Sequence, residues 1–238
     1  MLILVLALIV SFVPSVLMFL FLLNNRKDDE EYQKNCTKLF WKGVPISLLV
    51  CLMDLILTLV FSFSGLSEAP ELLKDVFKCF VINATVEETC KFLVANKYIK
   101  ADRERVSRLD VISYLTIAAI SFGLVEDIVY MFSTNVGQII VRGVLMGHVP
   151  YELFMGLFYG KGLAENNKGC KILAFVVPIL FHGSYNLLLK ESMPDWSAVV
   201  VITEVFIEVI FLVYMIFFIR KKRNDPQYTS PIFADAKE

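Results

Sequence analysis

Two adjacent glutamates followed by a lysine form the chemically most distinctive pattern in this chain of 238 residues. Glu87 and Glu88 stand in an apolar stretch, and Lys91 follows at the i+3 and i+4 spacings that share one helix face. Two close carboxylates beside one cation bind protons with different affinities, so one can act as a base and the other as an acid. The pattern predicts acid–base chemistry; its alternative is a structural ion pair that joins helices.

Three later apolar segments each hold a pair of residues with at least one polar side chain: Phe122 with Glu126, Arg142 with His148, and His182 with Asn186. Both histidines of the chain belong to this set. Glutamate and histidine are common proton donors and acceptors in enzymes. Together with Glu87–Lys91 these segments indicate that four successive elements contribute to one site.

The elements that must position these residues are membrane helices. The chain is 57% hydrophobic and only 20% charged, with a mean hydropathy of +0.64, whereas about a quarter of the residues of a soluble domain are charged. A helix needs about 20 apolar residues to cross the bilayer core. The stretches that reach or approach this length are Leu2–Leu23, Pro45–Gly65, Asp75–Val94, Leu109–Phe132, Gln138–Gly160, Lys171–Leu189 and Ser197–Ile219.

We therefore predict an all-α fold, a polytopic membrane helix bundle of about seven transmembrane helices. Residues 1–223 form a single transmembrane domain, and residues 224–238 a disordered cytoplasmic tail. The net charge of −1 shows no basic excess for binding nucleic acid. Seventeen Lys and Arg residues fall in one set of alternate connections and two in the other, which predicts an outside N-terminus and a cytoplasmic C-terminus.

Ionisable residues inside such spans are functional candidates, because each costs at least about 2.5–3.5 kcal/mol near the bilayer centre. The four polar segments lie at a similar depth when the helical rise is applied, which predicts a hydrated active-site cavity or a proton or ion path. Asp54 stands alone in its span and is interpreted as a helix–helix hydrogen-bonding residue. Glu204 and Glu208 are interpreted as an interior face or a partner surface.

The order of the motifs resembles that of the PrsW family of intramembrane proteases, which is related to the CAAX prenyl protease and bacteriocin-processing (CPBP) group. The motifs are Glu87-Glu88-x-x-Lys91, Phe122-x-x-x-Glu126, Arg142 with His148, and His182-x-x-x-Asn186, all within residues 83–189. One departure is Asp127, where the family pattern has asparagine.

The resemblance implies a multi-pass protease of the bacterial cell membrane. Its partners would be the lipid bilayer and a single-pass membrane protein such as an anti-sigma factor. The expected reaction is the outward-side (site-1) cut of that protein, which leads to release of a sigma factor.

On this resemblance, the catalytic residues are expected to be Glu87, Glu88, His182, His148 and Glu126. Glu87 and Glu88 would supply the carboxylate that activates water, while Lys91 keeps the other carboxylate ionised. His182, aided by His148 and Asn186, would polarise the carbonyl group or protonate the leaving nitrogen, and Glu126 would orient a histidine. Lys91, Asn186, Arg142 and Phe122 are supporting residues.

A zinc variant of this mechanism stays open, with His148, His182 and Glu126 as the three ligands. The chain contains no H-E-x-x-H motif, so no cofactor is favoured and zinc is possible. Two other classes of function also stay open. One is a proton-coupled transporter or channel with a Glu/His relay, although no internal repeat is evident. The other is a non-catalytic scaffold that binds transmembrane segments.

Overall fold

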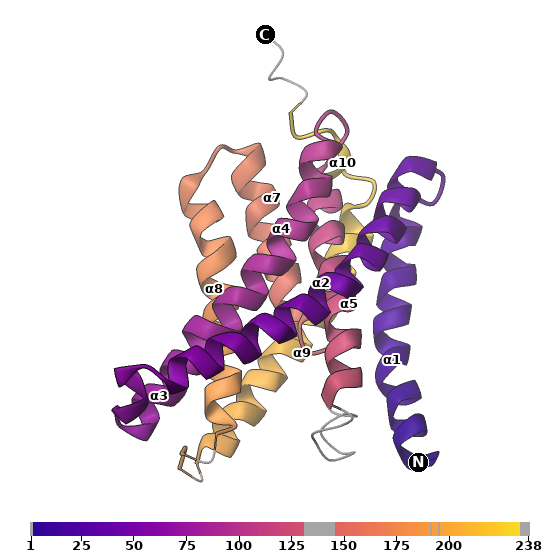
Figure 1. Cartoon of the computed structure of the whole chain (residues 1–238). Coiled ribbons are helices and arrows are strands. Elements are labelled where there is room, and N and C mark those ends of the chain that lie inside the picture. Colours follow the sequence, from indigo (N-terminus) through magenta and orange to yellow (C-terminus); the bar gives the residue numbers. More distant parts are fainter. Residues whose placement is uncertain (1, 131–145, 191, 195, 234–238) are drawn as a thin grey trace.

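The computed structural model describes residues 2–130, 146–190, 192–194 and 196–233, and every regular element in them is a helix (Figure 1). The all-α prediction is thus confirmed for these residues. The longer helices are α1 (Leu2–Leu23), α2 (Glu30–Ser62), α4 (Thr85–Ala101), α5 (Arg108–Tyr130), α7 (Val149–Ala164), α8 (Lys168–Leu188) and α9 (Ser197–Lys222). The shorter elements are α3 (Glu71–Val76), α10 (Pro226–Thr229), a π-helix (Phe77–Ala84) and two 3₁₀ turns (Asn24–Arg26 and Gly65–Glu68).

Helix α5 forms the centre of the bundle and packs against α1, α2, α4 and α7. Its residues are buried on every side from Leu109 to Phe122, as expected for a helix that is apolar all round. Gly156 of α7 allows the closest approach, because a Cβ there would lie 2.6 Å from the Cα of Ile112. This contact fixes the start of α7, and with it His148, relative to α5.

Among the residues that the structure describes, five helical segments are long and apolar enough to cross a membrane: α1 with the turn after it, α2, α5, α8 and α9. Their outer faces carry exposed apolar side chains such as Leu17, Val60 and Phe206, which are 60%, 61% and 65% exposed. So much exposed apolar surface is typical of a protein embedded in lipid. The chain is a multi-pass membrane protein, while the count of seven spans and the orientation of the termini stay predictions.

The two remaining predicted spans are segments that contribute several of the polar residues. Helix α4 contains 17 residues, among them Glu87, Glu88 and Lys91, and α7 contains 16 residues and follows His148. In Figure 1, α7 lies beside α8, and α4 lies beside α5. The polarity and shortness of α4 and α7 explain why length and composition alone do not identify them as spans among the described residues.

The predicted span Asp75–Val94 lies within one continuous helical segment that runs from α3 through the π-helix into α4. Each π turn holds an extra residue, which changes the face on which the following residues lie. Phe80 of this segment packs onto α8 at Gly183, where a Cβ would lie 2.4 Å from the ring. The π-helix therefore helps to set the direction in which Glu87 and Glu88 point.

The predicted span Gln138–Gly160 needs correction. Helix α7 begins at Val149, and His148 is its N-cap residue instead of lying midway along a helix. Pro150, in the first turn, lacks an N–H that the start of a helix would leave unpaired anyway, which favours a helix start at this position. Residues 138–145, including Arg142, lie outside the described residues.

The predicted disorder of residues 224–238 is also wrong for the part that the structure describes. Helix α10 is capped by Asp225, whose side chain accepts a hydrogen bond from the backbone N–H of Gln227. The N–H of Ile232 donates to the carbonyl oxygen of Val106 at 2.8 Å, and Tyr228 packs against the core. Apolar side chains in the tail, which contains few charges at this point, explain why it folds back onto the bundle.

Figure 1 shows the α1–α2, α4–α5 and α7–α8 connections at the end of the bundle where α10 lies, and α1 begins at the opposite end. Ion pairs join these connections, since Arg26 contacts Asp110 at 2.6 Å and Arg108 contacts Glu165 at 3.3 Å. The basic residues counted in the sequence therefore gather at one end of the molecule.

Candidate active site

Four helices bring the predicted polar residues together inside the bundle. We call the following set the buried network: Glu87, Glu88 and Lys91 of α4, Glu126 of α5, His148 at the start of α7, and His182 of α8. The side chain of Glu126 is 13% exposed, and the other five residues are more deeply buried. The convergence of four segments, predicted from their order in the sequence, is therefore seen in the structure.

Glu88 lies at the centre of the buried network. Its Oε1 atom accepts hydrogen bonds from Lys91 Nζ at 2.6 Å and from His182 Nδ1 at 2.8 Å, and both Glu88 and Lys91 have fully buried side chains. Two positively polarised donors on one oxygen favour the carboxylate form of this group. Glu88 therefore orients His182, much as the aspartate of a catalytic triad orients its histidine.

The hydrogen bonds of His148 determine which ring nitrogen carries its proton. Lys91 Nζ lies 2.9 Å from His148 Nδ1, and an ammonium group can only donate, so Nδ1 accepts. The proton of the neutral ring is then on Nε2, which donates to Glu126 Oε2. Glu126 thus contacts His148, in the orienting position expected from the sequence.

Glu87 faces the two imidazoles. One carboxylate oxygen of Glu87 and one nitrogen each of His148 and His182 all lie within 4.8 Å of one another. The distance from His182 Nε2 to Glu87 Oε2 is 3.8 Å, and the two imidazole centroids are 5.1 Å apart. Since Glu88 holds the other side of His182, its Nε2 is directed at the space beside Glu87.

Three residues outside the expected catalytic and supporting residues also contact the buried network. The carboxyl group of Asp54 of α2 lies close to that of Glu87 of α4, in line with its interpretation as a residue between helices. Glu152 is fully buried beside Glu88 and Lys91, and no donor among the described residues reaches either of its carboxyl oxygens. Tyr151 stacks on His182 with centroids 5.4 Å apart. In the sequence, Asp54 and Glu152 can be recognised as candidate site residues because each is a carboxylate in an apolar segment. Nothing in the sequence marks Tyr151 as a site residue.

The supporting residues lie at different distances from this centre. Lys91 Nζ lies 5.9 Å from the centroid of the buried Phe122 ring. Asn186 lines a small cleft together with His148, Tyr151 and His182, so its amide faces the same space. Asp127 is buried and lines a separate small cavity beside His148. Arg142 lies outside the described residues.

The metal-ligand set expected from the sequence changes in the structure. Glu87, not Glu126, is the carboxylate grouped with His148 and His182, whereas Glu126 hydrogen-bonds to His148. The three residues fit zinc by type and spacing, because catalytic zinc sites use three such ligands and an open position. Both ring nitrogens of His148 have protein partners, so metal binding would require the release of Lys91 or Glu126 from His148.

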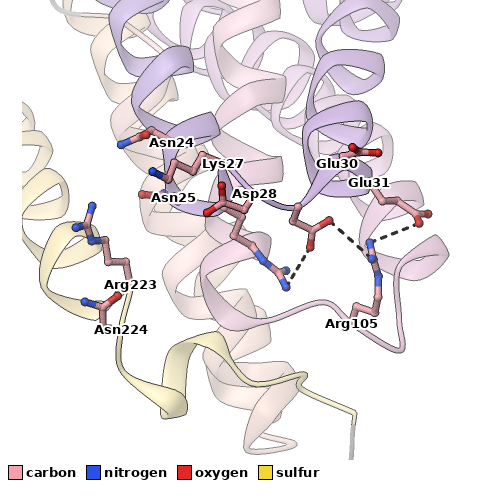
Figure 2. Close-up of a pocket in the computed structure, with 11 residues that line it drawn as sticks. Asn24, Asn25, Lys27, Asp28, Glu30, Glu31, Arg105, Arg223 and Asn224 are labelled. Atoms are coloured by element: carbon pink, nitrogen blue, oxygen red, sulfur yellow. Dashed lines mark ion pairs between the residues drawn. The ribbon is translucent and has the colours of Figure 1, made fainter.

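A much larger cavity lies elsewhere in the described part of the chain. It has a volume of about 790 Å³ and is formed at the α1–α2 connection with Arg105 and Arg223 (Figure 2). Arg105 pairs there with Asp29 and Glu31, each at 3.8 Å. No residue of the buried network lines this cavity, so cavity size does not mark the acid–base centre.

The fold and the buried network define a multi-pass helical membrane protein with an acid–base centre inside the bundle. Comparison with protein families agrees: the model described as "PrsW family intramembrane metalloprotease" matches residues 34–219. The chain therefore belongs to the PrsW family and is a membrane protease.

Curated relatives are called Protease PrsW. The relative from Clostridioides difficile (strain 630) is 27% identical over 180 residues, which cover 71% of this chain and 73% of the relative. The relative from Oceanobacillus iheyensis is 31% identical over 111 residues, covering 45% and 52%. The relative from Bacillus subtilis (strain 168) is 26% identical over 125 residues, covering 50% and 57%. No solved structure matches the chain.

Proposed function

We propose that this protein hydrolyses a peptide bond in a single-pass protein of the bacterial cell membrane, with Glu87 as the group that activates water. The observation that carries the proposal is the meeting of Glu87, His148 and His182, from three separate helices, within 4.8 Å inside an apolar bundle. Burying such groups is costly, so their convergence at one point favours a chemical role over a chance distribution.

In the proposed reaction, Glu87 accepts a proton from water while the water oxygen bonds to the carbonyl carbon of the substrate. The amide of Asn186 donates a hydrogen bond to the carbonyl oxygen, where negative charge develops. Glu87 passes the proton taken from water to Nε2 of His182, which lies 3.8 Å away, while Nδ1–H of the same ring donates to Glu88. The resulting imidazolium gives the proton from Nε2 to the leaving nitrogen as the C–N bond breaks, which returns His182 to its neutral form.

We favour this glutamate mechanism over the zinc variant, because Lys91 places a positive charge 2.9 Å from His148. If zinc binds, Glu87, His148 and His182 would hold it, and the metal would polarise the carbonyl group or activate the water. Metal analysis of the purified protein decides between them. The glutamate mechanism predicts substoichiometric zinc and full activity after chelation, whereas loss of activity restored by zinc would contradict it.

The proposed cut lies at the outward side, and a single-pass anti-sigma factor is the proposed substrate. Glu126 is four residues from the end of α5, and His148 stands at the start of α7, so the centre is near the end opposite the basic connections. The excess of Lys and Arg at the other end supports a cytoplasmic location for that end and seven crossings. We also propose that the PrsW family is evolutionarily related to the CPBP group.

The test is cleavage of a single-pass substrate reconstituted in the same vesicles, with both products identified by mass spectrometry. We expect cleavage by the wild type and a loss of about 10²-fold or more in Glu88→Gln and His182→Ala. Asp75→Asn is a matched control, because Asp75 is a buried carboxylate outside the buried network. Undiminished cleavage in both active-site variants would contradict the proposal, and binding without cleavage by the wild type would favour the scaffold.

A further inference from the structure

A second, apolar cavity lies next to the polar cleft. Its volume is about 180 Å³, and its walls come from α7, α8 and α9 through Pro150, Phe154, Val177, Phe181, Ile207 and Phe211. We call it the apolar pocket, because most of the side chains that line it are apolar. Tyr151 and Glu208 line both the apolar pocket and the cleft that contains His148, His182 and Asn186. The two spaces therefore adjoin, and an occupant of one lies beside the other.

The volume of the apolar pocket suits one large apolar side chain. An engineered cavity of about 150 Å³ with similar lining stays dry and binds benzene. A volume of about 180 Å³ thus accepts an isobutyl or benzyl group, but it is far too small for a helix. The occupant that matches this size is a single Leu or Phe side chain.

The apolar pocket is reached from the side of the bundle. Ile207 of α9 and Phe181 of α8 are 49% and 37% exposed at its wall, on helices whose outer surfaces are apolar. A polar contact attaches α9 beside it, in which Ser184 Oγ donates to Glu204 Oε1 at 3.0 Å, and Tyr151 and Glu208 line the same space. A membrane-embedded segment can therefore reach the apolar pocket without leaving the hydrocarbon.

The polar cleft distinguishes a peptide from a lipid chain as the occupant. A peptide bond beside the apolar pocket would present its carbonyl oxygen and N–H group to His182 and Asn186, which line the cleft. A hydrocarbon tail has no group to pair with these side chains. Tyr151, stacked on His182 and lining the apolar pocket, keeps an occupying side chain one ring away from the imidazole.

We propose that the apolar pocket binds a large apolar side chain of the substrate adjacent to the cleaved peptide bond, so that the enzyme selects Leu or Phe over Ala at that position. The inference rests on the proposed proteolytic function and adds the determinant of its specificity. Burial of the additional carbon atoms predicts a preference of about 10-fold to 100-fold in kcat/KM.

The first test compares Val177→Trp with Val176→Trp on single-pass peptides in vesicles that carry Ala, Leu or Phe beside the cleaved bond. Val177 lines the apolar pocket, whereas its neighbour Val176 is 43% exposed and does not. We expect Val177→Trp to lower kcat/KM for the Leu and Phe peptides at least about 10-fold more than for the Ala peptide. Val176→Trp should behave like the wild type. An unchanged ranking of the three peptides in Val177→Trp would overturn the inference.

The second test separates this inference from the proposed function. A peptide with benzoylphenylalanine at the selected position is photo-crosslinked to the His182→Ala variant in phosphatidylcholine vesicles. We expect crosslinks on the α7, α8 or α9 segments that contain Phe154, Val177 or Phe211. Crosslinks there without cleavage by the wild type would refute the proposed proteolytic function but would still support the apolar pocket as a binding site for the peptide. Cleavage with crosslinks elsewhere, or a photoreactive lipid chain in the apolar pocket that the peptide does not displace, would refute the inference alone.

Discussion

The buried network and the charged cavity of Figure 2 both bring carboxylates and basic side chains together, but they differ in burial and pairing. In the charged cavity, Arg105 is 41% exposed and lies within ion-pair distance of Asp29 and Glu31. In the buried network, Glu88 and Lys91 are fully buried and 2.6 Å apart. Lys91 is the one lysine of the buried network, which as defined contains no arginine. The carboxyl groups near Lys91 therefore outnumber the basic side chains.

The difference shows which charged cluster performs chemistry. Exposed ion pairs contribute about 0–1 kcal/mol and are common on any protein surface. Buried charges cost several kcal/mol unless they are well paired, and surplus carboxylates add to that cost. The smaller, buried cluster is therefore the one whose presence needs a functional explanation, although the charged cavity has much the larger volume. Four predictions test this contrast.

The largest expected effect follows from removal of the buried cation. Lys91→Met leaves the Glu88 carboxylate without its buried partner and should lower the free energy of unfolding by about 3–5 kcal/mol. Cleavage should fall below detection as well. Unfolding in detergent and cleavage in vesicles measure the two effects. The double variant Glu88→Gln/Lys91→Met should regain most of the stability but none of the activity, and a stable, active Lys91→Met would contradict the importance of the pair.

A smaller effect is expected for the group that orients His148. Glu126→Leu removes the acceptor for the His148 Nε2 proton, so the ring loses its fixed orientation. By analogy with residues that orient metal-bound histidines, kcat should fall about 10–100-fold with little change in KM. Glu126→Gln, which keeps an oxygen acceptor, should retain more activity than Glu126→Leu. Equal activities of the two variants would show that the hydrogen bond has no orienting role.

Glu152→Gln should stabilise the protein, because neither carboxyl oxygen of Glu152 has a donor among the described residues. An amide in its place can donate to the neighbouring Glu88 carboxylate, and we expect a gain of about 1 kcal/mol in unfolding free energy. Glu68→Gln, at an exposed carboxylate, serves as the control and should change nothing. A loss of stability in Glu152→Gln would mean that this carboxylate has a partner essential to the fold.

The smallest effect is expected in the charged cavity. Arg105→Ala removes contacts with Asp29, Glu31 and Asp102 but should cost less than about 1 kcal/mol, because the side chain is exposed. Cleavage rates should equal those of the wild type, and high salt should abolish the remaining difference in stability. If Arg105→Ala lost as much activity as the buried-network variants, the charged cavity would also be needed for cleavage, and the contrast between the two clusters would be wrong.

The contrast also explains how much the sequence could predict. Glu87, Glu88, Lys91, Glu126 and His182 were found because each is a costly residue in an apolar helix, and their helix spacing predicted shared faces. The helical nature of the chain followed from composition in the same way. These signals depend on single residues or single helices.

What escaped prediction depends on packing between helices. The role of Asp54 beside Glu87, and that of Glu152 beside Glu88, depends on how α2, α4 and α7 face one another after the π-helix. Tyr151 looks like any aromatic core residue until its stacking on His182 is known. The sequence does not mark the helix start at Val149, because its apolar character continues across this position. The folding of the tail depends on its contacts with the bundle, such as the hydrogen bond from Ile232 to Val106, which the sequence does not show.

The central claim is that Glu87, at the meeting point of His148 and His182, activates the water that cleaves the substrate. The most direct measurement is the rate of cleavage of one single-pass substrate by wild type and Glu87→Gln in identical vesicles, with unfolding midpoints compared in parallel. The proposed mechanism predicts a fall of about 10²–10⁴-fold in rate with a folded protein and bound substrate. A Glu87→Gln variant that cleaves at the wild-type rate would contradict it.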